Sequence, residues 1–100
     1  MRIVKITAVK KIWHEELSEK YENPVTHPCD IREGEVFYSE NGLMPPCFCK
    51  SAWQNLEPYV KFLAEGNENL FDGWMKNPRS AMISCNDGFR PVSFYLEASE

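Results

Sequence analysis

The four cysteines are the residues of this sequence whose chemistry stands out most. They are Cys29, Cys47, Cys49 and Cys85, and each lies beside a proline, a predicted helix start or a predicted turn. A thiolate can coordinate a soft metal ion or act as a nucleophile. Because loops at the ends of secondary-structure elements can converge, these cysteines can share one site although they are distant in the chain.

The spacing of the cysteines differs from the usual zinc pattern. Structural zinc sites pair their ligands as Cys-x2-4-Cys, whereas a single residue separates Cys47 from Cys49 and the other two cysteines stand alone. Three interpretations stay open, in order of preference. The thiols are small core residues, they hold a metal ion or a cluster, or they include a reactive or redox-active thiol.

Cys49 has one further feature that favours a functional role, as a metal ligand or as a nucleophile. It precedes Ser51, which we expect to be the N-cap of an amphipathic helix. The helix dipole and the free N–H groups at a helix start stabilise a thiolate, which suits a metal ligand and a nucleophile equally. No general base is evident beside Cys49, so the sequence leaves open whether the protein is an enzyme.

Five other residues are candidates for the same site. His27 precedes Pro28-Cys29 and can supply a nitrogen ligand, although a single histidine in a loop is more often structural. Asp87 and Arg90 flank the last predicted turn, where turn formation alone explains the aspartate and a polar role beside Cys85 is the alternative. Trp74, in an irregular segment, is a candidate for lining a pocket. The fifth candidate is Cys47.

The elements that must position these residues follow from periodicity. Alternating apolar residues predict strands, and apolar residues at steps of three and four predict helices. Pro58 either kinks the second helix or starts a new one. The predicted elements are a strand over 2–9, a helix around Trp13, Leu17 and Tyr21, a strand within 34–40, a helix from Ser51 to Gly66, a loop over 67–78, and strands over 80–85 and around Val92, Phe94 and Leu96.

The predicted fold is a single α+β domain over residues 1–100 with the order β-α-β-α-β-β. Its last two strands form an antiparallel hairpin around Asn86-Asp87-Gly88. The helix face formed by Trp53, Leu56, Val60 and Leu63 packs against that sheet. A chain of 100 residues can bury one core without disulfides or metal.

Composition excludes several classes of function. The net charge is −4 and the one basic concentration, formed by Lys5, Lys10 and Lys11, lies beside Glu15 and Glu16, which argues against binding to nucleic acid or to an anionic membrane. No apolar run approaches the roughly 20 residues of a membrane span, and the start of the chain does not resemble a signal peptide. We therefore expect a cytoplasmic protein whose thiols stay reduced.

The motifs around the cysteines resemble those of a family of small bacterial and archaeal proteins that has no assigned biochemical role. The family pattern places a Cys ahead of a Gly-containing strand, then Pro-x-x-x-Cys-x-x-Ala-Trp, then Cys-x-Asp-Gly-x-Arg-Pro-Val-x-Phe. Here the first Cys is Cys29, and the two motifs span residues 45–53 and 85–94. The resemblance implies that Cys29, Cys49 and Cys85 are the pattern cysteines and that Cys47 is additional. Ile31-Arg32 stands where many relatives have Gly-His, so no histidine role is carried over there.

Three functions are predicted, with a binding module first. In it Cys29, Cys49 and Cys85 hold a metal ion such as zinc, or a metallocofactor, and the three sulfurs lie close together at one end of the hairpin. The alternatives are a thiol-dependent or redox enzyme that uses Cys49, and an accessory subunit that binds a protein partner. In that last case the exposed aromatics Phe48, Phe71 and Trp74 form the contact patch.

Overall fold

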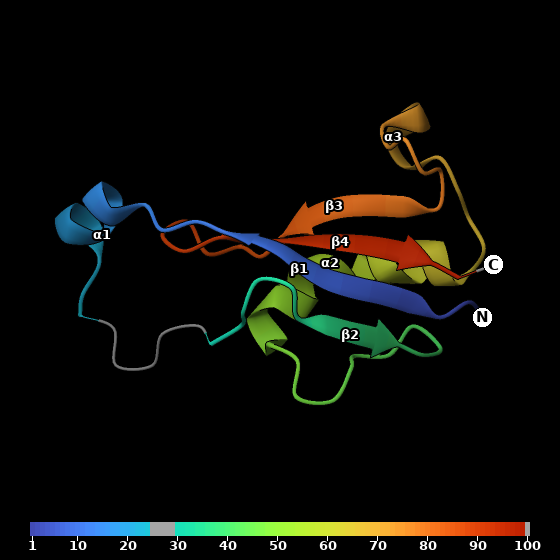
Figure 1. Ribbon diagram of the computed structural model, residues 1–100, viewed down its shortest axis with the longest axis horizontal. Coiled ribbons are helices and arrows are strands. Elements are labelled where there is room, and N and C mark those ends of the chain that lie inside the picture. The colour runs from blue at the N-terminus through green and yellow to red at the C-terminus, as the bar shows by residue number, and fades with distance from the viewer. Residues whose placement is uncertain (25–29, 100) are drawn as a thin grey trace.

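The computed structural model describes residues 1–24 and 30–99, and all statements about its structure refer to these residues. Four strands and two helices follow the predicted order, with one short helical turn in addition (Figure 1). The elements are β1 (Val4–Lys11), α1 (Glu15–Tyr21), β2 (Val36–Ser39), α2 (Lys50–Ala64), α3 (Leu70–Gly73), β3 (Ser80–Ser84) and β4 (Val92–Ala98). No helix of the described chain is both long and apolar enough to cross a bilayer.

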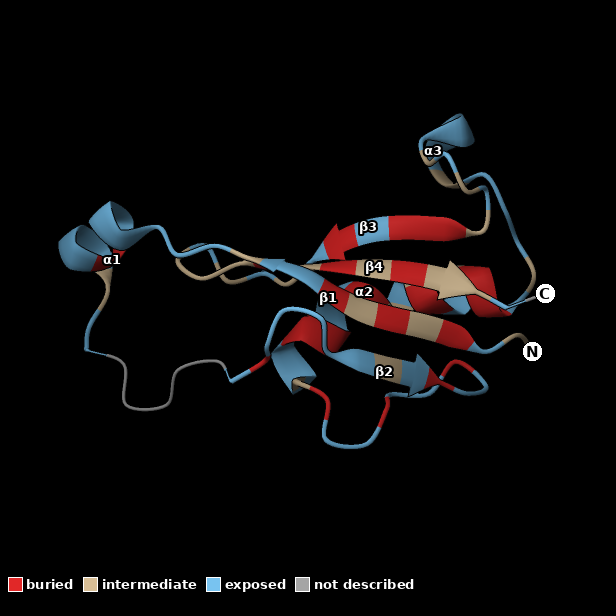
Figure 2. Cartoon of the chain, viewed as in Figure 1, coloured by how far each residue is buried: buried red, intermediate tan, exposed pale blue. Residues whose placement is uncertain are grey.

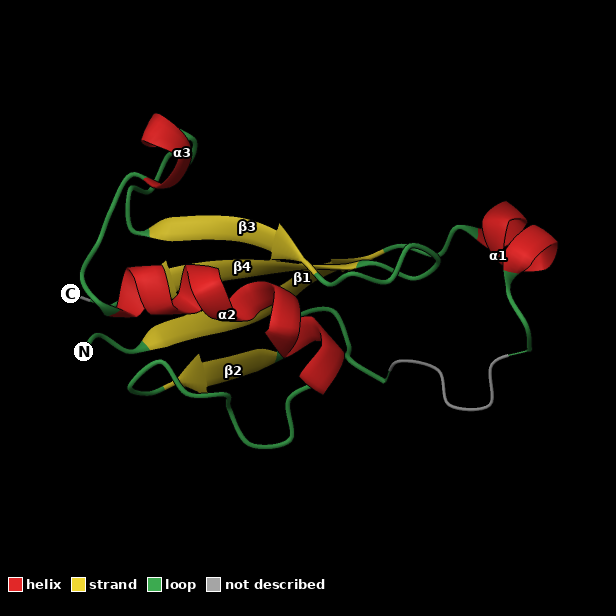
Figure 3. Cartoon of the chain, turned by 180° about the vertical axis from the view of Figure 1, so that it is seen from behind, coloured by secondary structure: helices red, strands yellow, loops and turns green. Residues whose placement is uncertain are grey.

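The four strands form one antiparallel sheet in the order β2-β1-β4-β3. Helix α2 covers one face of the sheet (Figure 3), and the face toward the viewer in Figure 1 carries no helix. The predicted α+β fold and the C-terminal β3–β4 hairpin are therefore confirmed. The connection between β3 and β4 runs from Cys85 to Pro91, so it is longer than a tight turn at Asn86-Asp87-Gly88.

The alternation along the strands produces the core as predicted. In β1 the side chains of Val4, Ile6 and Ala8 are fully buried, and in β4 Phe94 and Leu96 are as well. Successive side chains of a strand point to opposite faces, so these residues all point toward α2. Figure 2 shows the buried positions alternating with more exposed ones along the central strands.

Helix α2 supplies the other half of the core with the face that the sequence predicts. Leu56, Val60 and Leu63 are fully buried, and Trp53 is nearly so. Pro58 lies inside this single helix and does not start a second one, although it cannot donate its backbone hydrogen bond. The predicted N-cap at Ser51 is wrong, because Cys49 occupies the N-cap position.

Phe48 directly precedes the N-cap of α2, and its burial contradicts a second prediction. We expected it in an exposed aromatic patch, but only 5% of its surface is exposed. Its ring packs against Phe37, Trp53 and Phe94, with centroid distances of 4.8, 6.3 and 5.5 Å. These separations are typical of favourable aromatic pairs. Phe71, by contrast, is 62% exposed on α3.

Strand β1 continues past the body of the sheet and carries α1 away from it. A bulge at Val9 shifts the register between β1 and β4. Beyond it, the amides of Ile12 and His14 donate to the carbonyls of Pro91 and Phe89. Helix α1 then begins at Glu15, so Trp13 precedes the helix and is not part of it. We call residues 10–22, with the facing segment 89–92, the arm; Figure 1 shows it projecting from the sheet.

The segment 67–78 is irregular apart from α3. This element is a single turn in which Phe71 and Asp72 have positive φ angles of 51° and 56°. Such angles belong to the left-handed region, which non-glycine residues rarely occupy. The predicted loop over 67–78 is therefore largely irregular in the structure, and α3 is the one helical turn within it.

Replacing Phe48 by Ala should destabilise the protein by about 3–5 kcal/mol, because the substitution leaves a cavity where four aromatic rings meet. Phe71→Ala is the matched control and should cost less than about 1 kcal/mol, since that ring is mostly exposed. Urea unfolding followed by tryptophan fluorescence measures both. Equal destabilisation by the two substitutions would contradict the assignment of Phe48 to the core.

Candidate thiol pocket

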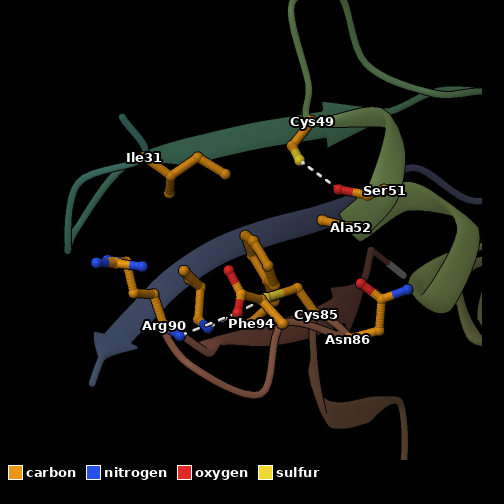
Figure 4. A pocket seen from close by; sticks show the side chains of 10 residues that line it. Ile31, Cys49, Ser51, Ala52, Cys85, Asn86, Arg90 and Phe94 are labelled. Carbon is orange, nitrogen blue, oxygen red and sulfur yellow. Dashed lines mark hydrogen bonds between the residues drawn. The ribbon is translucent and has the colours of Figure 1, made fainter. Parts of the chain in front are cut away.

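A small pocket lies where β3 ends and α2 begins (Figure 4). Its volume is about 60 Å³. Two of the predicted cysteines, Cys49 and Cys85, belong to its wall, together with the predicted polar residues Asp87 and Arg90. The rest of the lining mixes apolar and polar side chains, namely Ile31, Ser51, Ala52, Asn86, Val92 and Phe94.

Cys49 reaches the pocket from the start of α2, where it is the N-cap residue. Burial by itself would raise the pKa of its thiol. Hydrogen bonding from the Ser51 hydroxyl and from the backbone amides of Ala52 and Ser51 outweighs burial, so the pKa of Cys49 lies below its usual value, although Asp30 opposes the change. The Cys49 Sγ to Ser51 Oγ distance is 3.2 Å. The fold therefore favours the thiolate at Cys49.

Cys85 enters the pocket from the other side, as the first residue after β3 (Figure 4). Its backbone N–H donates to the Val92 carbonyl at 3.0 Å. The Val92 N–H donates in turn to the Cys85 sulfur at 3.3 Å. These two bonds hold the sulfur at the base of the β3–β4 connection, in a pocket whose wall also includes Phe94.

Asp87 and Arg90 shape the loop that closes the pocket. One carboxylate oxygen of Asp87, Oδ1, accepts hydrogen bonds from the amides of Phe89 and Arg90, at 2.8 and 3.1 Å. This is the turn chemistry expected of an aspartate. The Arg90 guanidinium pairs with Glu22 of the arm at 2.6 Å and lies 5.3 Å from the Trp13 ring centroid. Arg90 therefore connects the pocket wall to the arm.

The other predicted site residues lie elsewhere or outside the described chain. Cys47 is exposed, with a φ angle of 61°, and is not part of the pocket wall. Trp74 follows α3 and contacts Phe71, at a ring distance of 5.4 Å. Helix α3 lies near the start of β3 (Figure 1), whereas the pocket wall contains Cys85, the first residue after the end of β3. Cys29 and His27 lie outside the described residues. Residues 1–24 and 30–99 contain no group of three side chains that could hold a metal ion.

Several residues of the pocket were not predicted as site residues. The sequence predicted Ser51 as the N-cap and not as the hydrogen-bond partner of Cys49. A serine two residues after a cysteine at a helix start would have indicated such a hydrogen bond. Ile31 and Asn86 carry no signal in the sequence, because only the fold brings their segments together. The same is true of Glu22, the partner of Arg90.

The chain was compared with protein-family models, with curated proteins and with solved structures, and no match was found in any of the three. The resemblance of the cysteine motifs to a family pattern therefore stays a prediction. The case for a function rests on the geometry of the pocket and of the arm.

Ser51→Ala should raise the pKa of Cys49, because it removes the side-chain hydrogen bond that stabilises the thiolate. The rate of iodoacetamide labelling at Cys49, measured by mass spectrometry as a function of pH, gives this pKa. In the wild type the labelling profile should lie at lower pH than in the urea-unfolded chain.

The same shift should appear in the stability of the protein. Between the native and the unfolded pKa of Cys49 the unfolded chain binds more protons than the native one. The free energy of unfolding should therefore rise with pH through that interval, and this contribution should be lost as pH falls through the native pKa. Ser51→Ala should reduce this dependence. A labelling profile that Ser51→Ala leaves unchanged would show that Ser51 does not stabilise the thiolate.

Proposed function

We propose that the thiol pocket binds a single soft metal ion, such as Zn²⁺, through Cys49 and Cys85. The observation that carries the proposal is that two cysteines from distant parts of the chain line one small pocket, and that the fold favours the thiolate of one of them. Metals of this class bind thiolates and not thiols. On this proposal the protein is a binding module, and its partner is a metal ion and not a nucleic acid.

The size of the pocket supports an ion over an organic ligand. Pockets for drug-sized molecules have volumes of about 300–1,000 Å³, several times the 60 Å³ or so found here. A water molecule takes up about 30 Å³ in the liquid. The pocket therefore suits an ion with a bound solvent molecule, or a group of a few atoms.

A third ligand is needed, and Cys29 is the proposed one. Two thiolates do not complete a four-coordinate site. Cys29 precedes the pocket residue Ile31 by two positions, and two residues of extended chain span at most about 7 Å. Cys29, Cys49 and Cys85 are also the three cysteines of the pattern that the sequence resembles. His27 or solvent is the proposed fourth ligand.

A site of this kind requires reduced thiols. Cysteines stay reduced in the cytoplasm, where disulfides are rare. We therefore propose the cytoplasm as the working compartment. Cys49 and Cys85 are both free in the structure, as a pair of thiolate ligands must be.

Protein purified without an affinity tag under anaerobic conditions should bind one Co²⁺ or Zn²⁺ per chain. Thiolate-to-cobalt charge-transfer absorption in the near ultraviolet reports the ligands directly. Cys49→Ser, Cys85→Ser and Cys29→Ser should each weaken binding by more than about tenfold, because even a change in the groups that orient a ligand costs about 10–100-fold in affinity. Cys47→Ser is the matched control and should bind as the wild type does, because Cys47 is not in the pocket wall.

Two results would contradict the metal proposal. One is metal bound well below one equivalent, with no change when the pocket cysteines are replaced. The other is equal loss of binding for Cys47→Ser and Cys49→Ser, which would indicate binding at surface thiols. Circular dichroism of each variant establishes that the fold is retained.

A second function, thiol chemistry at Cys49, is favoured by the hydrogen bonds that stabilise its thiolate. In this case the Cys49 thiolate attacks one sulfur of a small disulfide, forms a mixed disulfide, and releases the other half as a thiolate. Labelling separates the two functions. One equivalent of Zn²⁺ should protect Cys49 from iodoacetamide if it is a ligand, and should leave the rate unchanged if the thiol acts alone.

A further inference from the structure

The loop that carries Cys85 is held at its far end by residues on both sides of α1. Arg90, near the end of this loop, is also part of the pocket wall (Figure 4). Its Nη1 donates to Glu22 Oε1 at 2.6 Å, and its guanidinium lies 5.3 Å from the centre of the Trp13 ring. Trp13 precedes α1 and Glu22 directly follows it, so one side chain of the loop contacts both ends of this helix.

The ion pair between Arg90 and Glu22 is sheltered from solvent. Its side chains are 24% and 19% exposed, whereas those of the Lys61–Glu57 pair on α2 are 50% and 43% exposed. Water screens exposed ion pairs, so they contribute little. A short, charge-assisted hydrogen bond that is shielded from water is stronger and has a more defined geometry. The Arg90–Glu22 pair is therefore suited to fixing the position of the loop.

Hydrogen bonds within the loop lead from Arg90 back to Cys85. The backbone amides of Phe89 and Arg90 both donate to Asp87 Oδ1, so the placement of Arg90 is tied to the shape of the turn. Two residues further on, the amide of Val92 donates to the Cys85 sulfur at 3.3 Å. The Cys85 sulfur therefore takes its position from the same short segment that Glu22 holds through Arg90.

Cys49, on the other wall of the pocket, takes its position from α2. It is the N-cap of that helix, and its sulfur forms a hydrogen bond with the Ser51 hydroxyl. Its carbonyl accepts from the amide of Trp53 at 2.9 Å. The two pocket cysteines are thus held by different parts of the fold, and the effect of Glu22 on one wall can be measured against the other.

We infer that Glu22 is a positioning residue of the metal site, which acts through Arg90 to fix the loop that presents Cys85 to the ion. The inference rests on the proposed function of the pocket. A ligand that is held in place before the ion arrives loses less conformational freedom on binding, and groups that orient a metal ligand contribute strongly to affinity. Separating Glu22 from Arg90 lowers the metal affinity, so this contact at the end of α1 regulates the site.

Hydrogen exchange of the metal-free protein tests the positioning without any metal. Glu22→Ala removes the acceptor of the pair, so the amides of Phe89, Arg90 and Val92 should exchange about two- to thirtyfold faster, the range expected when one contact of a network is lost. The amide of Trp53 should exchange at the wild-type rate, because it reports on the wall formed by α2. Two-dimensional NMR spectra recorded over time in deuterated buffer give all four rates.

Metal titration tests the role of Glu22 in binding. Glu22→Ala should weaken Co²⁺ binding about two- to thirtyfold. Glu19→Ala is the matched control, since Glu19 is an exposed glutamate of the same helix, and it should bind as the wild type does. In an Arg90→Ala background, Glu22→Ala should have no further effect, because the residue through which it acts is gone.

Three results would overturn the inference. The first is loop amides that exchange at the wild-type rate in Glu22→Ala, or a Trp53 amide that is accelerated equally, which would indicate a general loss of stability. The second is unchanged Co²⁺ affinity in Glu22→Ala when the wild type binds one equivalent. The third is an equal effect of Glu22→Ala with and without Arg90. A wild type that binds no metal would instead refute the proposed function, and the exchange rates would still show whether Glu22 fixes the loop.

Discussion

The burial of the Phe48 ring is the contact on which the thiol pocket depends. Phe48 packs on Phe37 of β2, Trp53 of α2 and Phe94 of β4, so one ring joins an edge strand, a central strand and the helix. Because aromatic pairs favour a narrow range of distances and angles, this contact determines where α2 begins on the sheet. Cys49 is the next residue, and its position at the pocket wall follows directly.

The same contact explains why Cys47 and Cys49, which flank Phe48, lie in different environments. Cys47 takes a left-handed backbone conformation and is exposed, while Cys49 is the N-cap of α2 and lines the same pocket as Cys85. Serine is the better N-cap by intrinsic preference, which is why Ser51 was expected there. With Phe48 buried, the helix starts two residues earlier, and the Ser51 hydroxyl serves the thiolate of Cys49 instead.

The pairing of β1 with β4 links the pocket to the arm. Beyond the bulge at Val9 the two segments continue side by side as far as His14 and Phe89. Arg90 belongs to the pocket wall and at the same time pairs with Glu22, which directly follows α1. The loop that carries Cys85 and the surface formed by Trp13, Leu17 and Tyr21 are therefore parts of one connected structure.

The sequence by itself determined the class of fold and the composition of the core. Alternation in Val4, Ile6 and Ala8 and helical spacing in α2 are local patterns, and each forces its residues onto one face. Only the tertiary structure decided which ends of these elements meet. Periodicity shows that residues share a face, but it contains no information on the direction in which a helix crosses a sheet, so the placement of Cys49 and Cys85 at one pocket depended on packing. For the same reason the spacing of Trp13, Leu17 and Tyr21 predicts a helix face without indicating what covers it. In the folded chain Trp13 precedes α1, and all three side chains are exposed.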